Sequence, residues 1–176
     1  MCSIIEQFEG PTSDQLAHAW LSAQPEHLSV VRTCDGVAGS AYHLLCPSGS
    51  MLEDRDPVVR AVLDNVARDG RTRPGERVDI IRYFAGAHEH QRDRYAVLAG
   101  PVSSIVEWLA RPLAWSFVVA TDTQYWAPFF DYVAFAPLVE TEFGGVRHVA
   151  YGIDWRRVPV DAWLGLRGWA WRRPGC

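Results

Sequence analysis

The chain has 176 residues, of which 48% are hydrophobic and 22% are charged, as expected for one soluble globular domain. Its formal net charge of −4 argues against a surface that attracts nucleic acid or anionic membrane as a whole. No apolar run approaches the roughly 20 residues that span a bilayer. Residues 1–6 lack the basic start and apolar stretch of a signal peptide. We therefore expect a cytoplasmic protein with no nucleic-acid or membrane partner.

The cysteine pattern indicates neither a metal site nor a redox site. The four cysteines are Cys2, Cys34, Cys46 and Cys176, and no two of them form a C-x-x-C pair. A zinc knuckle or a redox motif normally contains such a pair. We expect reduced thiols and no bound metal.

The first half of the chain predicts two helices on either side of a hairpin. The predicted elements are a helix at residues 13–23, strands at 28–32 and 39–46, and a helix from Pro57 to the residue before Gly70. Ser13 or Asp14 is suited to cap the first helix. The pair Asp35-Gly36 between the strands is typical of a hairpin turn.

The second half alternates strands with helices. The predicted elements are a strand at 78–85, a connection at 86–100, a helix at 101–111, a strand at 115–120, a helix at 123–135, a hairpin of strands at 139–143 and 146–151, and a short helix at 161–166. The strand at 78–85 is almost continuously apolar, which is typical of a central strand covered on both faces. Pro101 is suited to the first position of a helix.

This order of elements resembles that of the GCN5-related N-acetyltransferase (GNAT) superfamily, over about residues 16–151. The resemblance implies an α/β fold with a central mixed sheet and helices on both faces. It also implies that the strands at 78–85 and 115–120 run parallel and splay apart. We expect one domain at residues 1–166 and a loosely ordered tail rich in Arg and Trp at 167–176.

The GNAT resemblance further implies a site for the pyrophosphate of acyl-CoA as co-substrate. The family motif Q/R-x-x-G-x-G/A follows the first of the splayed strands, where backbone N–H groups at a helix start surround the phosphates. The best match here places Arg94 where the motif has glycine. The matching residues are Gln91, Arg92, Asp93, Arg94, Tyr95 and Ala96. In this family a backbone N–H of the preceding strand, near Tyr83, Phe84 and Ala85, stabilises the oxyanion.

A second family feature concerns the proton for the departing thiolate. Members commonly carry a tyrosine on the helix after the second splayed strand, and Phe130 stands at that position. Phenylalanine donates no proton. Tyr132 lies two residues on, roughly 200° around the helix, and is the candidate that takes this role with a shifted geometry.

The segment His88-Glu89-His90 supplies candidates for the general base that keeps an amine neutral. His88 and Glu89 are the two that we assign to catalysis. The alternative is an exposed polar loop, and a metal held by His88 and His90 has no third ligand placed by spacing.

Three further patterns have both a functional and a structural interpretation. Glu140 and Glu142 share one strand face, and either receive a cationic amine or face solvent. The aromatic residues of the helix at 123–135 either pack in the core or line an acyl pocket. The tail at 167–176 either binds an anionic surface or is loosely ordered.

The sequence therefore predicts an N-acyltransferase that moves an acetyl or longer acyl group from acyl-CoA to an amine on a small molecule or a protein. The alternative is a GNAT-fold module that has lost catalysis and binds a ligand or regulates a partner. A homodimer is compatible with both interpretations.

Overall fold

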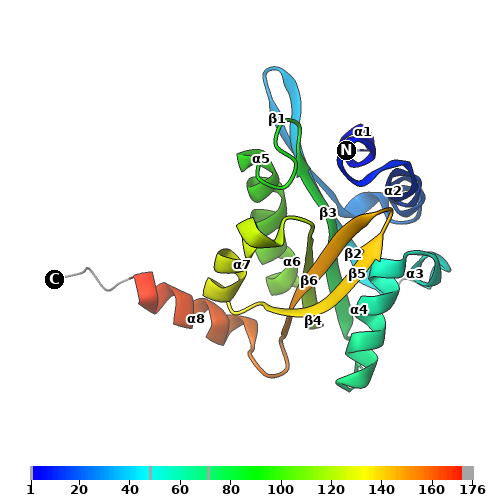
Figure 1. The fold of residues 1–176 in the computed structure, drawn as a ribbon. Helices are drawn as coiled ribbons and strands as arrows, with labels where there is room; N and C mark the ends of the chain where they lie inside the picture. Colours follow the sequence, from blue (N-terminus) through cyan, green and yellow to red (C-terminus); the bar gives the residue numbers. More distant parts are fainter. Residues whose placement is uncertain (1, 48, 71, 172–176) are drawn as a thin grey trace.

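The computed structural model describes residues 2–47, 49–70 and 72–171 of the chain. Its centre is a six-stranded sheet in the order β1-β2-β3-β4-β6-β5 (Figure 1). The strands are β1 (Leu28–Thr33), β2 (Gly36–Cys46), β3 (Arg77–Gly86), β4 (Leu113–Ala120), β5 (Ala136–Phe143) and β6 (Val146–Asp154). The mixed sheet confirms the predicted fold class, and each strand lies where the sequence predicts one.

The central strands β3 and β4 are parallel, whereas the other neighbouring pairs are antiparallel. The last residues paired between β3 and β4 are Ile81 and Val118. The strands themselves continue to Gly86 and Ala120. They therefore diverge at their C-terminal ends, which confirms the predicted splayed pair.

A bulge in β3 accompanies this divergence. In the pairing of β2 with β3, Tyr42 lies opposite Tyr83 and His43 lies opposite Ile81, so Arg82 has no opposite residue. A bulge bends its strand and increases the local twist. It occurs at the residue where β3 stops pairing with β4.

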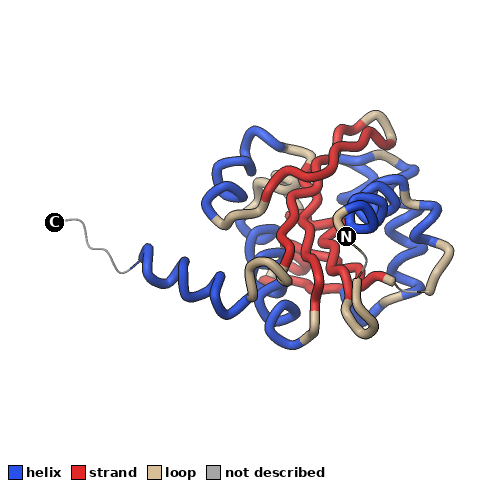
Figure 2. The backbone as a smooth tube through the Cα atoms, turned by 90° about the horizontal axis from the view of Figure 1, so that it is seen from below, coloured by secondary structure: helices blue, strands red, loops and turns tan. Residues whose placement is uncertain are grey.

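Helices cover both faces of the sheet. One face carries α1 (Cys2–Glu9), α2 (Pro11–Ala23), α3 (Leu52–Arg55) and α4 (Pro57–Arg68), with a short helical turn η1 (Pro25–His27) that leads into β1. The other face carries α5 (Arg94–Val97), a π-helical turn η2 (Leu98–Val102), α6 (Ser103–Ala110), α7 (Thr123–Tyr132) and α8 (Val160–Trp171). Figure 2 shows the strands between these two groups of helices.

Each face has its own hydrophobic core. Trp20 of α2 and Val62 of α4 pack on one face against Ile80 and Phe117 of the sheet. Trp108 of α6 and other aromatic side chains pack on the opposite face. None of the helices in the described part of the chain is long and apolar enough to cross a membrane.

Two helix starts differ from the predictions. The first predicted helix begins at Pro11, and its N-cap is Gly10, with φ 85°; the hydroxyl of Ser13 instead donates to Glu9 Oε2 over 2.9 Å. The helix expected from Pro101 begins at Ser103, because proline has no N–H for the α-helical ladder and lies in η2.

Two helix ends also differ. α7 stops at Tyr132 instead of 135, because Ala134 adopts a left-handed conformation with φ 61°. α8 extends through Trp171, past the predicted end at 166. It projects away from the sheet in Figures 1 and 2. Residues 172–176 of the expected tail lie outside the described residues.

Candidate functional site

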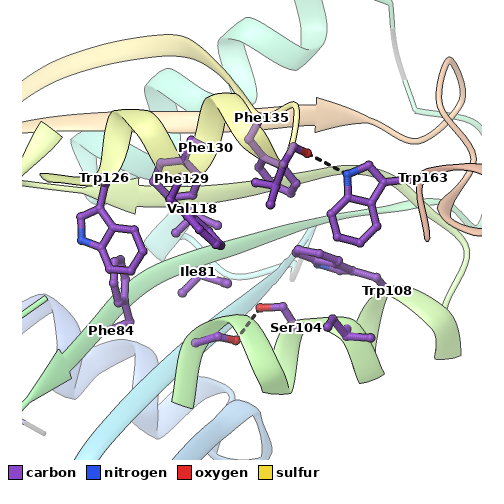
Figure 3. Close-up of a pocket in the computed structure, with 13 residues that line it drawn as sticks. Ile81, Phe84, Ser104, Trp108, Val118, Trp126, Phe129, Phe130, Phe135 and Trp163 are labelled. Carbon is purple, nitrogen blue, oxygen red and sulfur yellow. Dashed lines mark hydrogen bonds between the residues drawn. The ribbon is translucent and has the colours of Figure 1, made fainter. Parts of the chain in front are cut away.

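An apolar cavity lies between α6 and α7, where β3 and β4 diverge (Figure 3). Its volume is about 260 Å³, close to the lower end of the roughly 300–1,000 Å³ of small-molecule pockets. The lining residues are Ile81, Phe84, Gly100, Ser104, Ile105, Trp108, Val118, Trp126, Phe129, Phe130, Val133, Phe135 and Trp163. None of these side chains is ionisable, so the cavity suits an apolar group.

The cavity is elongated along the diverging strands. Figure 3 shows Phe84 and Trp126 at one end and Trp108 and Trp163 at the other. The hydroxyl of Ser104 donates to Gly100 O over 2.7 Å, and the indole of Trp163 donates to the carbonyl of Val133, also over 2.7 Å. These polar atoms are therefore satisfied within the protein.

One buried donor in the lining has no partner. The side chain of Trp126 is 3% exposed and packs edge-on against Phe84, with ring centroids 5.4 Å apart. Its Nε1 has no hydrogen-bond partner among the described residues. A buried unsatisfied donor costs about 1–3 kcal/mol.

Phe130, at the family's tyrosine position, and Tyr132, the candidate proton donor, lie in different environments. Phe130 lines the cavity and stacks on Tyr151, with ring centroids 4.2 Å apart. Tyr132, at the end of α7, is 50% exposed and lies outside the lining. The resemblance alone pointed to Tyr132.

Three residues of β3 were expected to supply the backbone N–H that stabilises the oxyanion, and their side chains point in different directions. Phe84 lines the cavity. Tyr83 lies on the opposite face, where its hydroxyl donates to Ser13 O over 3.2 Å. Ala85 is buried and pairs with Ser40 of β2.

Gln91, the first residue of the expected pyrophosphate motif, bridges the gap between the diverging strands. Its Nε2 donates to Val119 O over 3.2 Å, and its Oε1 accepts from Thr121 N over 2.8 Å. The side chain is 1% exposed. The side chain of Gln91 therefore forms hydrogen bonds with the backbone at the end of β4, where β3 no longer pairs with that strand.

The rest of that motif folds around the carboxylate of Asp93. Oδ1 of Asp93 accepts from Tyr95 N over 2.9 Å, and Oδ2 accepts from His88 N over 3.3 Å. Arg94 and Ala96 belong to α5, with Asp93 as its N-cap. The side chain of Arg92 instead pairs with Asp122.

A buried charged cluster lies on the α1 side of the sheet. Arg82, at the bulge, is fully buried and contacts Asp56 and Glu9. Oε2 of Glu9 also lies 3.2 Å from His148 Nε2. Burial alone raises the pKa of Glu9, but His148, His90 and Arg82 lower it below its ordinary value. Glu9 is therefore an anion within the core.

His90 lies between this cluster and a surface groove. Its Nε2 is 3.6 Å from Glu9 Oε1, and its ring stacks on Phe8 with centroids 4.7 Å apart. Its backbone has φ 50°, which is unusual for a residue other than glycine. The groove has a volume of about 430 Å³ and is lined by Phe8, Glu89, His90, Gln91, Arg92, Thr121, Asp122, Thr123 and Gln124.

The two predicted bases are neighbours of His90 in the turn after β3. Glu89 lines the groove, whereas His88 faces a hollow beside the β1–β2 hairpin. Neither lines the apolar cavity. The segment forms a turn, so His88 and His90 do not share an extended strand face.

His43, Asp79 and Ser103 lie in the spatial order of a catalytic triad beneath α6. His43 Nδ1 is 3.1 Å from Asp79 Oδ1, and His43 Nε2 is 3.0 Å from Ser103 Oγ. The Ser103 hydroxyl, however, donates to the Gly100 carbonyl over 3.0 Å. Its proton is committed to the backbone, so this group has a structural role.

The exposed polar candidates are accounted for by local contacts. Glu140 forms a two-pronged ion pair with Arg147, as on a solvated strand face. Cys2, Asp14 and His18 form the one group in the described part of the chain whose ligand atoms lie within 4.8 Å of one another. Burial, followed by Asp14, raises the pKa of the Cys2 thiol, which opposes metal binding.

Neither a protein-family model nor a curated protein matches the sequence, but solved structures match the fold. FeeM, described as an N-acyl amino acid synthase from uncultured soil microbes, aligns with a TM-score of 0.59 at 10% identity, over 86% of this chain and 80% of that chain. The chain shares the fold of this synthase.

A second match is the C-terminal condensation domain of Ebony in complex with beta-alanyl-dopamine. It aligns with a TM-score of 0.53 at 13% identity, over 85% of each chain. At these identities the likeness is one of fold. The shared fold agrees with the mixed α/β architecture expected from the element order.

The sequence did not point to Glu9 or Arg82 as members of a site. Glu9 lies in α1, which the sequence does not predict, and Arg82 looks like an exception within an apolar strand. The one available signal was that charge: an arginine inside a strand expected to be covered on both faces needs a buried acidic partner.

Proposed function

We propose that this protein is an N-acyltransferase that moves an acyl group longer than acetyl from a thioester to an amine. The observation that carries the proposal is the apolar cavity at the divergence of β3 and β4. An acetyl group has one methyl to bury, whereas a cavity of about 260 Å³ accommodates several methylenes. Each buried methylene contributes about 0.8 kcal/mol to binding.

The acceptor amine enters by the groove at the C-terminal ends of these strands. His90 is the base that keeps the amine neutral, and the buried carboxylate of Glu9 lies beside its ring. His90 Nε2 and Glu9 Oε1 lie 3.6 Å apart. The positive φ of His90 supports this role, since backbone strain gathers at functional sites. His88 and Glu89 are alternative bases.

The leaving thiolate needs no protein acid in this scheme. Phe130 lines the cavity where the family carries tyrosine and has no proton to donate. A thiol ionises near pH 8.5, so it departs as a thiolate and takes a proton from water. Tyr132 would act only by reaching the thiolate from its exposed position.

The two structural neighbours support acyl transfer to an amine as the reaction class. One is described as an N-acyl amino acid synthase, and the other is a condensation domain bound to beta-alanyl-dopamine. Acyl-CoA is the first donor to test, and a small amine is the first acceptor. Acetyl-CoA serves as the short-chain reference.

The test measures thiol release from thioesters of increasing chain length in the presence of a panel of amines. We expect turnover to rise with chain length until the cavity is filled. Val118→Phe places a ring in the cavity and should lower kcat/KM for the longest good substrate by about tenfold or more, which corresponds to about 1.4 kcal/mol. Activity with the acetyl donor should change little.

Val106→Phe is the matched control, because Val106 lies on α6 but is 65% exposed and does not line the cavity. It should leave the chain-length profile unchanged. Equal activity of Val118→Phe and the parent protein on long chains would show that the acyl group binds elsewhere.

A ligand-binding module without catalysis is the second candidate. It is favoured by the absence of any ionisable side chain in the cavity lining and by Phe130 at the family's tyrosine position. Tight binding of long acyl thioesters with no turnover on any amine would select this function over the transferase.

A further inference from the structure

The loop that the GNAT-like fold uses for pyrophosphate already holds an anion of its own. Asp93 is 6% exposed. Its carboxylate accepts from the backbone N–H groups of Tyr95 and His88, over 2.9 and 3.3 Å. Consecutive backbone N–H groups around an anion form the usual cradle for phosphate. In this chain two N–H groups of the loop, from residues that are not consecutive, are already bonded to the carboxylate of Asp93.

Three further backbone N–H groups of the loop are also engaged. Arg92 N donates to Glu89 O over 3.0 Å, and Asp93 N donates to His90 O over 3.3 Å. Ala96 N donates to Asp93 O over 2.9 Å. A phosphate group at this loop would have to displace bonds that the loop makes with itself.

The loop packs closely against β2 and β3. A Cβ atom on Gly86 of β3 would lie 2.1 Å from Asp93 Cβ, and one on Gly39 of β2 would lie 2.5 Å from the Tyr95 carbonyl carbon. Two glycines therefore let the loop lie directly on the strands. A rearrangement that freed its bonded N–H groups would have to disturb this packing.

The two arginines near the loop do not outweigh the negative charge of the carboxylates around it. Arg92 is paired with Asp122, and Arg94 donates to the hydroxyl of Tyr95 over 2.9 Å. The adjoining hollow also contains Asp35 and Glu89. A pyrophosphate here would meet three carboxylates, an arginine that is paired with a carboxylate, and Arg94, which is hydrogen-bonded to a neutral phenol.

We propose that the thioester donor is recognised through its acyl chain and pantetheine arm alone, with no binding of the nucleotide phosphates. The substrate class is then acyl-pantetheine thioesters, irrespective of what the arm is attached to. The inference rests on the proposed function, because it describes the donor of the same transfer. The inference goes beyond the proposed function because it assigns donor binding to the cavity and not to the loop.

The experiment compares one acyl chain on three thiols: CoA, pantetheine and N-acetylcysteamine. Charge-assisted contacts to phosphate are worth about 1.5–3 kcal/mol each, so an enzyme that binds the nucleotide loses at least about tenfold in kcat/KM without it. Here we expect CoA and pantetheine thioesters to agree within about threefold, which is under 1 kcal/mol. Adenosine 3′,5′-bisphosphate should not inhibit.

A preference of tenfold or more for the CoA thioester over the pantetheine thioester would overturn the inference and leave the proposed transferase intact. Absence of product from every thioester would instead overturn the transferase. In that case titration of the same two thioesters by calorimetry decides the inference by itself: equal affinities support it, and a CoA preference of tenfold or more refutes it.

Discussion

His90 illustrates at the scale of a single residue how placement decides a role. Three candidate bases are consecutive in sequence, but only His90 combines contact with a buried carboxylate and a position in the groove. Its neighbour His88 lies in the other hollow. The two histidines therefore form a matched pair for mutagenesis.

We expect His90→Asn to lower kcat by about 10²–10⁴-fold, the usual contribution of a general base, with little change in donor affinity. Asparagine tolerates positive φ better than most residues, so the turn should keep its shape. The measurement is steady-state kinetics at saturating amine.

His88→Asn is the control and should retain near-parental kcat. A large loss in His88→Asn with none in His90→Asn would transfer the base role to His88. Unchanged pH–rate profiles in both variants would remove imidazole from the mechanism.

At the scale of elements, buried polar contacts join α6 to the sheet. Asp79 of β3 lies 3.1 Å from His43 of β2 and accepts from the Trp108 indole of α6 over 3.0 Å. Burial disfavours the imidazolium, but the charge and hydrogen bond of Asp79 outweigh it and raise the pKa of His43. Glu107 acts in the same direction. These contacts hold one wall of the apolar cavity.

This raised pKa predicts a pH dependence of stability. The folded-state pKa of His43 lies above the unfolded value near 6.5. The stabilisation is therefore complete below about pH 6.5 and is lost as the pH rises through the folded-state pKa. Urea unfolding at several pH values should show that the free-energy difference between the parent protein and His43→Gln shrinks as the pH rises.

His18→Gln removes an exposed imidazole from α2 and controls for the loss of one titratable group. Its difference from the parent should not change in the same way with pH. A difference between parent and His43→Gln that grows with pH would contradict the assigned direction.

At the scale of the whole molecule, the Arg82 cluster links segments that are distant in sequence. It brings together Glu9 of α1, Asp56 at the start of α4, Arg82 of β3 and His148 of β6. All four side chains are buried. The cluster lies at the bulge where β3 leaves β4, so it supports the divergence on which the cavity depends.

Arg82→Met should destabilise the protein by about 3–5 kcal/mol, because removal of one partner leaves buried carboxylates without a counter-charge. Denaturant unfolding measures the loss. Arg60→Met is the control: Arg60 pairs with Asp54 and Asp64 on the surface, where such pairs contribute about 0–1 kcal/mol. Similar losses of unfolding free energy in both variants would show that the buried cluster contributes no more to stability than a surface ion pair.

The sequence by itself determined where the strands and most of the helices lie along the chain. Their signals are local: the apolar run of β3, the Asp35-Gly36 turn, and Asp56 before Pro57, which caps α4 through Val58 N and Val59 N. Since parallel strands need a helical crossover, this order also implied that β3 and β4 are parallel, whereas their divergence was implied only by the GNAT resemblance. Pro101 misled the boundary of α6 because a π-helical turn precedes that helix.

Only the tertiary structure decided what the site contains. The sequence from Gln91 to Ala96 resembles a phosphate-binding loop. Whether its N–H groups are free depends on where the Asp93 carboxylate lies after the loop has packed against Gly39 and Gly86. The contact of Glu9 with His148 spans 139 positions, and no local pattern encodes it. Propensity acts over a few neighbouring residues, whereas a cavity or a buried ion pair exists only after separate elements have packed together.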